Sequence, residues 1–269
     1  MYKNSDISFD VYDVNAWCSV GVMLFLITLV TLFGLRWRHN SIPIMQVLTI
    51  LLVNEILFSA SEVLGYIDNS NSMLCMISII GRVSFSVAAN FWIIFITRLI
   101  YREALAPGKY FNMVNFVFKN IIFTYIPSLI LGIFLLVIIN ISTTDSEKIC
   151  WQVITNRQAL DYVIFGTTFI LPNLATSVII IVYLLLLYNL PGRKWTFFLL
   201  FPLTSLVFCI YYMSIKFYQL FNQDTDMGYF NLAMLGQPII YGVYYVVVYF
   251  RQKRKETNSS DITIRGSDG

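Results

Sequence analysis

The chain has 269 residues, of which 58% are hydrophobic, 16% aromatic and only 12% charged. A soluble domain is usually less than half apolar and about a quarter charged, so this composition excludes a disordered, fibrous or DNA-binding protein. The net charge of +3 is too small for a general nucleic-acid binder, and one histidine with four cysteines provides no set of metal ligands. We therefore expect a one-domain polytopic membrane protein without nucleic-acid partner, metal or other cofactor.

Seven apolar segments follow one another along the chain, and each is long enough to cross a bilayer as a helix, which needs about 20 residues. They cover residues 16–35, 42–66, 74–101, 120–139, 162–188, 195–220 and 227–250. The runs are too long, and alternate too little, for the strands of a membrane barrel. The predicted fold class is an all-α bundle of seven membrane helices over residues 16–250.

Basic residues predict the orientation, because they mark the cytoplasmic side of a membrane protein. With the N-terminus outside, the inner segments hold thirteen of the 18 basic residues. The outer segments hold Lys3, Lys148, Arg157 and Lys216, and Arg82 lies within the membrane. Residues 1–15 lack the basic start and cleavage site of a secretory signal, so we expect a short extracellular N-terminus and an uncleaved first helix. Residues 251–269 open with RQKRK and predict a basic, mostly disordered cytoplasmic tail.

Two cysteines fall on the predicted outer side, where a disulfide can form and persist. Cys75 opens the third segment, and Cys150 lies in the longest outer loop. We predict a bridge that ties this loop to the third helix; the alternative is two free thiols that pack as small apolar side chains. Cys18 and Cys209 lie within helices and are expected to pack there.

Glu55, Glu62 and Arg82 are charged residues at depth in the predicted membrane segments, where charge is costly, faces the bundle interior and usually marks function. Glu62 and Arg82 fall at similar depth in the outer half of adjacent helices, so they either face a ligand or pair for structure. Glu55 lies seven residues before Glu62, near mid-depth. It is expected in a buried polar network, or in an ion or proton site, that shifts on activation.

The third segment and the longest outer loop contain cysteines and aromatic residues at defined spacings. Trp92 follows Cys75 by seventeen residues, Tyr101 follows nine further on, and Cys150 is paired with Trp151. In these positions the chain resembles the G-protein-coupled receptors of the secretin-like and slime-mould cyclic-AMP-receptor-like branch. The seventh segment contains Gln237-Pro238-Ile239-Ile240-Tyr241, which is similar to the Asn-Pro-x-x-Tyr motif of rhodopsin-like receptors.

The resemblance implies a non-enzymatic plasma-membrane receptor that binds an extracellular ligand of unknown type and signals through a heterotrimeric G protein. The expected ligand-binding residues are Arg82, Glu62 and Trp151. The expected activation and G-protein-coupling residues are Glu55, Trp92, Arg98, Tyr101, Arg102, Gln237, Pro238 and Tyr241. A buried hydroxyl is costly unless paired, so we expect Tyr241 to meet Arg98 or Arg102 at the inner end of the third helix.

Four prolines lie well inside the predicted membrane segments. Pro127, Pro172, Pro202 and Pro238 are each expected to interrupt a helix, and those of the sixth and seventh helices act either as pivots or as tolerated kinks.

The alternative function is a small multi-pass transporter or channel, in which Glu55 and Arg82 line a path. A membrane enzyme is disfavoured, because no paired carboxylates, histidine cluster or nucleophile with a base falls at one depth.

The predicted orientation can be tested with accessible tags. A tag fused at Met1 should bind antibody on intact cells, whereas a tag at Gly269 should bind only after permeabilisation, because the basic residues gather on the inner side. A C-terminal tag that is accessible on intact cells would contradict this orientation and the receptor hypothesis with it.

Overall fold

The computed structural model describes residues 11–34, 43–67, 72–105, 113–138, 166–189, 199–221 and 235–265. In these ranges the chain forms helices and no strand. The α-helices are α1 (Val11–Leu29), α2 (Pro43–Ile67), α3 (Ser72–Leu105), α4 (Met113–Ile138), α6 (Leu171–Tyr188), α7 (Leu200–Phe221) and α9 (Gly236–Arg265). Two π-helical segments adjoin them, η1 (Val30–Gly34) after α1 and η3 (Gly166–Ile170) before α6. The predicted all-α class is confirmed for these residues.

Six of the described helices, α1, α2, α3, α4, α6 and α7, are long and apolar enough to cross a membrane. At 1.5 Å per residue, about 20 residues span the hydrocarbon core, and these spans contain 19 to 33 residues. The chain is therefore an integral membrane protein. The seventh predicted segment, 227–250, is described only from Leu235 onward, and α9 begins at Gly236.

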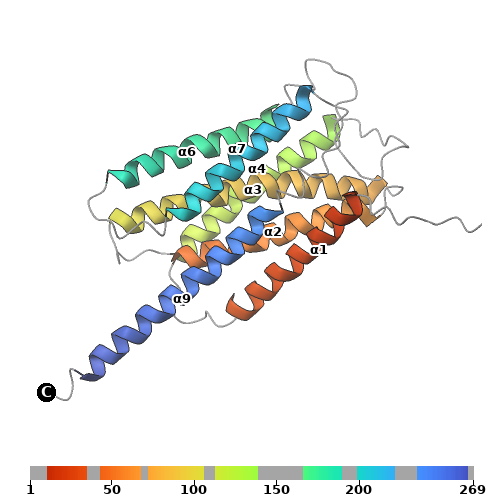
Figure 1. The fold of residues 1–269 in the computed structure, drawn as a ribbon. Helices are drawn as coiled ribbons and strands as arrows, with labels where there is room; N and C mark the ends of the chain where they lie inside the picture. Colours follow the sequence, from red (N-terminus) through yellow and green to blue (C-terminus); the bar gives the residue numbers. More distant parts are fainter. Residues whose placement is uncertain are drawn as a thin grey trace, which may run out of the picture.

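The helices run alternately up and down and pack into one bundle (Figure 1). Helix α3 packs against α2, α4, α6 and α7, and α9 packs against α1, α2 and α7. The last helix thus closes the bundle against the first. We call the end at which α1 and α3 begin the N-terminal end, and the end from which α9 projects the C-terminal end (Figure 1).

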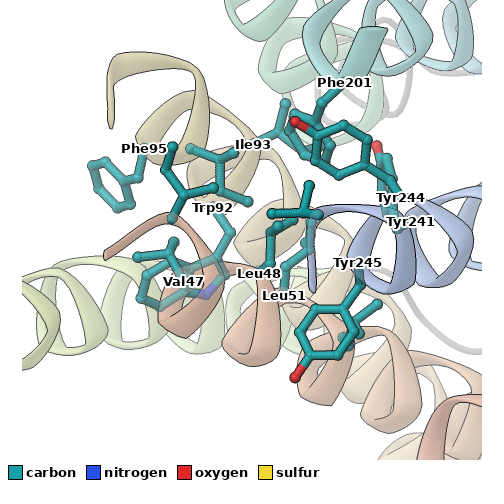
Figure 2. Close-up of a cluster of buried hydrophobic side chains, with 14 of the residues drawn as sticks. Val47, Leu48, Leu51, Trp92, Ile93, Phe95, Phe201, Tyr241, Tyr244 and Tyr245 are labelled. Carbon is teal, nitrogen blue, oxygen red and sulfur yellow. The ribbon is translucent and has the colours of Figure 1, made fainter. Parts of the chain in front are cut away.

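Large aromatic side chains form the centre of the bundle. Trp92, Phe201, Tyr241 and Tyr245 are fully buried, and Figure 2 shows them around aliphatic side chains of α2 and α3 such as Leu48. The Trp92 indole N–H donates to the Tyr125 hydroxyl at 3.3 Å. Lipid tails are as apolar as these side chains, so close packing and hydrogen bonds, rather than expulsion from water, hold such a core together.

The outer faces of α4 and α6 carry the opposite pattern. Phe123, Ile130 and Phe134 on α4, and Val182 and Leu185 on α6, expose large apolar side chains. Apolar surface of this extent is not stable against water on a monomeric soluble protein. These faces are those that contact lipid.

Three of the four prolines that were expected to interrupt a helix lie near the start of a described α-helix. Pro202 and Pro238 lie in the first turn of α7 and α9, where a missing backbone N–H costs little. Pro172 is the second residue of α6, which continues directly from the π-helical segment η3. Pro127 lies in the interior of α4. Whether Pro202 and Pro238 act as pivots or as tolerated kinks stays a prediction.

Helix α9 also differs from the predicted polar tail. It continues without a break through the basic residues after Phe250 and ends at Arg265. Arginine, lysine and glutamate are good helix formers, so the apolar part of α9 can propagate into this segment. Figure 1 shows that part of the helix projecting beyond the bundle.

Helices α2 and α3 approach each other closely through small residues. A Cβ added at Gly81 of α3 would lie only 2.8 Å from the Cβ of Ser61 on α2. Nearby, the Ser78 hydroxyl donates to the Ser61 carbonyl oxygen at 2.8 Å. Small residues and hydrogen bonds between helices are typical of tight packing in membranes.

We predict that Gly81→Ala lowers the melting temperature of the purified protein, because the extra methyl group forces the two helices apart at a cost of about 1–3 kcal/mol. Gly21→Ala is the matched control, since a Cβ at Gly21 meets no atom within 4 Å and alanine favours the helix. Equal melting temperatures for the two variants would contradict the close approach of α2 and α3.

Candidate functional site

Glu62 and Arg82, which the sequence placed at similar depth, come together in the structure. Glu62 lies on α2 and Arg82 on α3, and the guanidinium interacts electrostatically with the carboxylate. The Ser19 hydroxyl on α1 donates to Glu62 Oε2 at 3.1 Å. Three helices thus meet around one carboxylate near the N-terminal end of the bundle.

Lys216 is the charged residue of this site that sequence reasoning missed. It was assigned to an outer segment, but its side chain is buried, with only 7% exposed, and lies inside the α7 membrane span. Its Nζ lies 5.1 Å from the ring centroid of Phe169 and 5.5 Å from that of Tyr212. It also interacts electrostatically with Arg82 and Glu62. We call Glu62, Arg82 and Lys216 the charged cluster.

The helical repeat of α7 contains a signal that would have identified Lys216. The inward residues of this helix are Phe201, Ser205, Cys209, Tyr212 and Lys216, spaced by three or four positions. Residues at this spacing share one face of a helix. Lys216 therefore continues the buried face of α7.

Gly65 makes room for Arg82 on α2. A Cβ at this position would lie 3.2 Å from Arg82 Nη2 and 2.6 Å from the Ser78 hydroxyl oxygen. The guanidinium can therefore lie against the α2 backbone, one turn from Glu62. The sequence feature that permits the cluster is thus a glycine, Gly65, facing the long cationic side chain of Arg82.

A series of hydrogen bonds runs along α3 and α7 from Tyr212, whose ring lies beside Lys216 of the charged cluster. The Tyr212 side chain is hydrogen-bonded to that of Ser86. Asn90 Nδ2 donates to the Ser86 carbonyl oxygen at 3.2 Å, and the Cys209 thiol lies 3.8 Å from Asn90 Oδ1 as its donor. We call Ser86, Asn90, Cys209 and Tyr212 the polar seam. Cys209 is also hydrogen-bonded to Ser177 of α6, so the seam joins three helices.

Tyr241 lies further toward the C-terminal end, on α9, and its partners differ from those expected. Gln237 Nε2 donates to the Tyr241 hydroxyl at 2.8 Å, and this hydroxyl donates to Ser205 Oγ at 3.1 Å. Gln237 lies one helical turn before Tyr241, which brings the two side chains to the same face. The predicted contact with Arg98 or Arg102 is wrong for this structure, since both arginine side chains are exposed.

The Tyr241 site adjoins the polar seam through α7. Ser205 lies one turn before Cys209, and Cys209 interacts electrostatically with the Tyr241 hydroxyl. Phe201 packs against Tyr241 and Tyr244 with ring centroids 5.2 Å apart (Figure 2). One face of α7 therefore carries the charged cluster, the seam and the contact with α9.

The remaining predicted residues are spread over the bundle. Glu55 is buried on α2, two turns from Glu62, and its neighbour Asn54 donates to the Phe85 carbonyl oxygen at 2.9 Å. The Tyr101 ring lies 5.5 Å from that of Tyr183 on α6. Pro238 is buried in the first turn of α9. The activation roles assigned to these residues stay predictions.

Cysteines are only partly described. Cys18 and Cys209 are free thiols, and Cys75 is buried at the start of α3 but is not among the free cysteines. Its predicted partner Cys150, and the predicted ligand residue Trp151, lie outside the described residues. The bridge between Cys75 and Cys150 therefore stays a prediction.

No protein-family model and no curated protein matches the chain. The charged cluster, the polar seam and the Tyr241 site are therefore the features from which a function can be inferred.

Proposed function

We propose that this protein is a seven-helix receptor of the plasma membrane that senses an extracellular ligand and signals through a heterotrimeric G protein. In this proposal 227–250 is the seventh span, the N-terminal end faces outward and the basic C-terminal end faces the cytoplasm. The contacts of α9 with α1 and α7 support a bundle closed by a seventh helix. The distribution of basic residues supports the orientation.

The ligand contacts the charged cluster. Glu62, Arg82 and Lys216 come from three helices, so a molecule bound there touches α2, α3 and α7 at once. Charge inside a membrane bundle is costly and is retained where it has a function. Trp151, in the loop that the Cys75–Cys150 bridge would tie to α3, covers the site in this proposal.

The polar seam carries the proposal, because it connects the charged cluster with the Tyr241 site along one face of α7. A ligand that favours one position of Lys216 also favours one position of α7, and with it of Cys209 and Ser205. A receptor changes state only if its ligand binds one of the two states better. The hydrogen bond between α7 and α9 is the element of this chain that differs between two such states.

We predict that Tyr241→Phe folds and reaches the surface but activates a G protein about fivefold less, because it lacks the hydrogen bond to Ser205 that joins α9 to α7, worth about 1 kcal/mol. The measurement is ligand-independent nucleotide exchange on a panel of Gα subunits by membranes that contain the full-length protein. Ser205→Ala should have the same effect, because it removes the other end of the bond.

Two controls make this experiment decisive. Tyr218→Phe changes an exposed tyrosine on α7, the helix that carries Ser205, and should leave nucleotide exchange unaltered. The double variant Tyr241→Phe/Ser205→Ala should be no weaker than either single variant, because all three lack the same bond. Absence of exchange on every Gα subunit would contradict the receptor proposal, and wild-type exchange by Tyr241→Phe would contradict the role of this tyrosine.

A further inference from the structure

The basic residues after Phe250 belong to the same helix as the apolar residues before it. Helix α9 runs from Gly236 to Arg265, and its sequence changes from apolar to RQKRK at Arg251. A helix that continues unbroken fixes the direction and the depth of the side chains on both sides of this boundary. The positions of the cations can therefore be derived from the residues above them.

One face of α9 is turned away from the bundle. Val243, Val247 and Phe250 are exposed on it, whereas Tyr241 and Tyr245 are buried on the opposite face. Side chains this apolar on the outside of a membrane bundle contact lipid. This lipid-facing stripe (Val243, Val247 and Phe250) leads directly to the basic segment.

Arg254 continues the lipid-facing stripe. It follows Val247 by seven residues, which is two helical turns, and so lies on the same face. Arg251 and Lys253 lie on either side of it, and all three side chains are exposed. The three cations thus lie on the side of α9 that faces the lipids in contact with Val243 and Val247, further along the helix.

The depth of these cations matches the lipid headgroups. A bilayer is about 40–45 Å thick with a hydrocarbon core of about 30 Å, which leaves a headgroup layer of about 5–7 Å on each side. From Phe250 to Arg254 the helix advances about 6 Å at 1.5 Å per residue. If Phe250 lies at the edge of the hydrocarbon, Arg251, Lys253 and Arg254 lie within the headgroup layer.

We propose that Arg251, Lys253 and Arg254 form a docking site for anionic phospholipids, such as phosphatidylserine, which holds α9 at the cytoplasmic membrane surface. Arginine binds phosphate and carboxylate groups in a bidentate manner, and the cytoplasmic leaflet carries the anionic lipids. The proposal rests on the orientation proposed above and is independent of receptor activity.

The test is native mass spectrometry of the purified full-length protein in detergent, titrated with dioleoyl-phosphatidylserine or dioleoyl-phosphatidylcholine. The wild type should bind phosphatidylserine more tightly than phosphatidylcholine. In R251Q/K253Q/R254Q this preference should fall by about a hundredfold, since each basic residue near a membrane surface contributes about fivefold. The charge-conserving variant R251K/K253R/R254K should keep most of it.

Two further measurements separate the effect of charge from a loss of folding. Raising the salt to about 0.5 M should weaken binding of phosphatidylserine by the wild type, which tests the charge without any mutation. The melting temperature of the neutral variant verifies that it folds. Equal binding of the two lipids by the wild type, undiminished preference in the neutral variant, or displacement of the lipid by millimolar inorganic phosphate would each overturn the proposal.

Discussion

The electrostatic attraction between Glu62 and the two cations Arg82 and Lys216 is the interaction on which the N-terminal half of the bundle depends. The three groups belong to α2, α3 and α7, and Ser19 adds α1 through its hydrogen bond with the carboxylate. Water screens such charges poorly inside a bundle. Burying one of them without an opposite charge nearby therefore costs much more free energy than burying it beside one. The close approach of α2 and α3 at Gly65 and Gly81 is what allows the guanidinium to reach its place.

The rest of the proposed mechanism follows from the position of Lys216 on α7. Its helix face continues through Tyr212 and Cys209 to Ser205, and each of these side chains is hydrogen-bonded to another helix. In the proposed mechanism, a shift of α7 exchanges hydrogen bonds with α3 and α9. Packed interfaces of this kind are bistable, which is how a small shift at one end of a bundle becomes a larger one at the other.

The sequence predicted the helices better than the contacts between them. Apolar length alone predicted seven spans, six of which are confirmed as candidate membrane helices, and depth alone brought Glu62 and Arg82 together. Lys216 was missed because it lies near the outer end of the sixth predicted segment and was counted with the outer residues, although the spacing of the inward residues of α7 extends to it. Gln237 could have been predicted as a partner of Tyr241, because it lies one helical turn earlier. Ser205 could not, because its contact with the hydroxyl depends on how α7 packs against α9. The sequence did not predict that α9 continues as a helix into the basic segment. That outcome depends on whether the apolar part of a helix can propagate into polar residues, which composition alone does not show.

A double-mutant cycle on Glu62 and Lys216 tests most directly whether the charged cluster acts as one unit. Glu62→Gln, Lys216→Met and the double variant would be unfolded reversibly in mixed micelles. We expect Glu62→Gln to lower the free energy of unfolding by about 0.5–3 kcal/mol more in the wild type than in the Lys216→Met variant. In that variant the carboxylate already faces one cation fewer. The same cycle with Lys119→Met, which removes an exposed cation of α4, should be additive. Effects of Glu62→Gln and Lys216→Met that add to within about 0.5 kcal/mol would contradict the cluster.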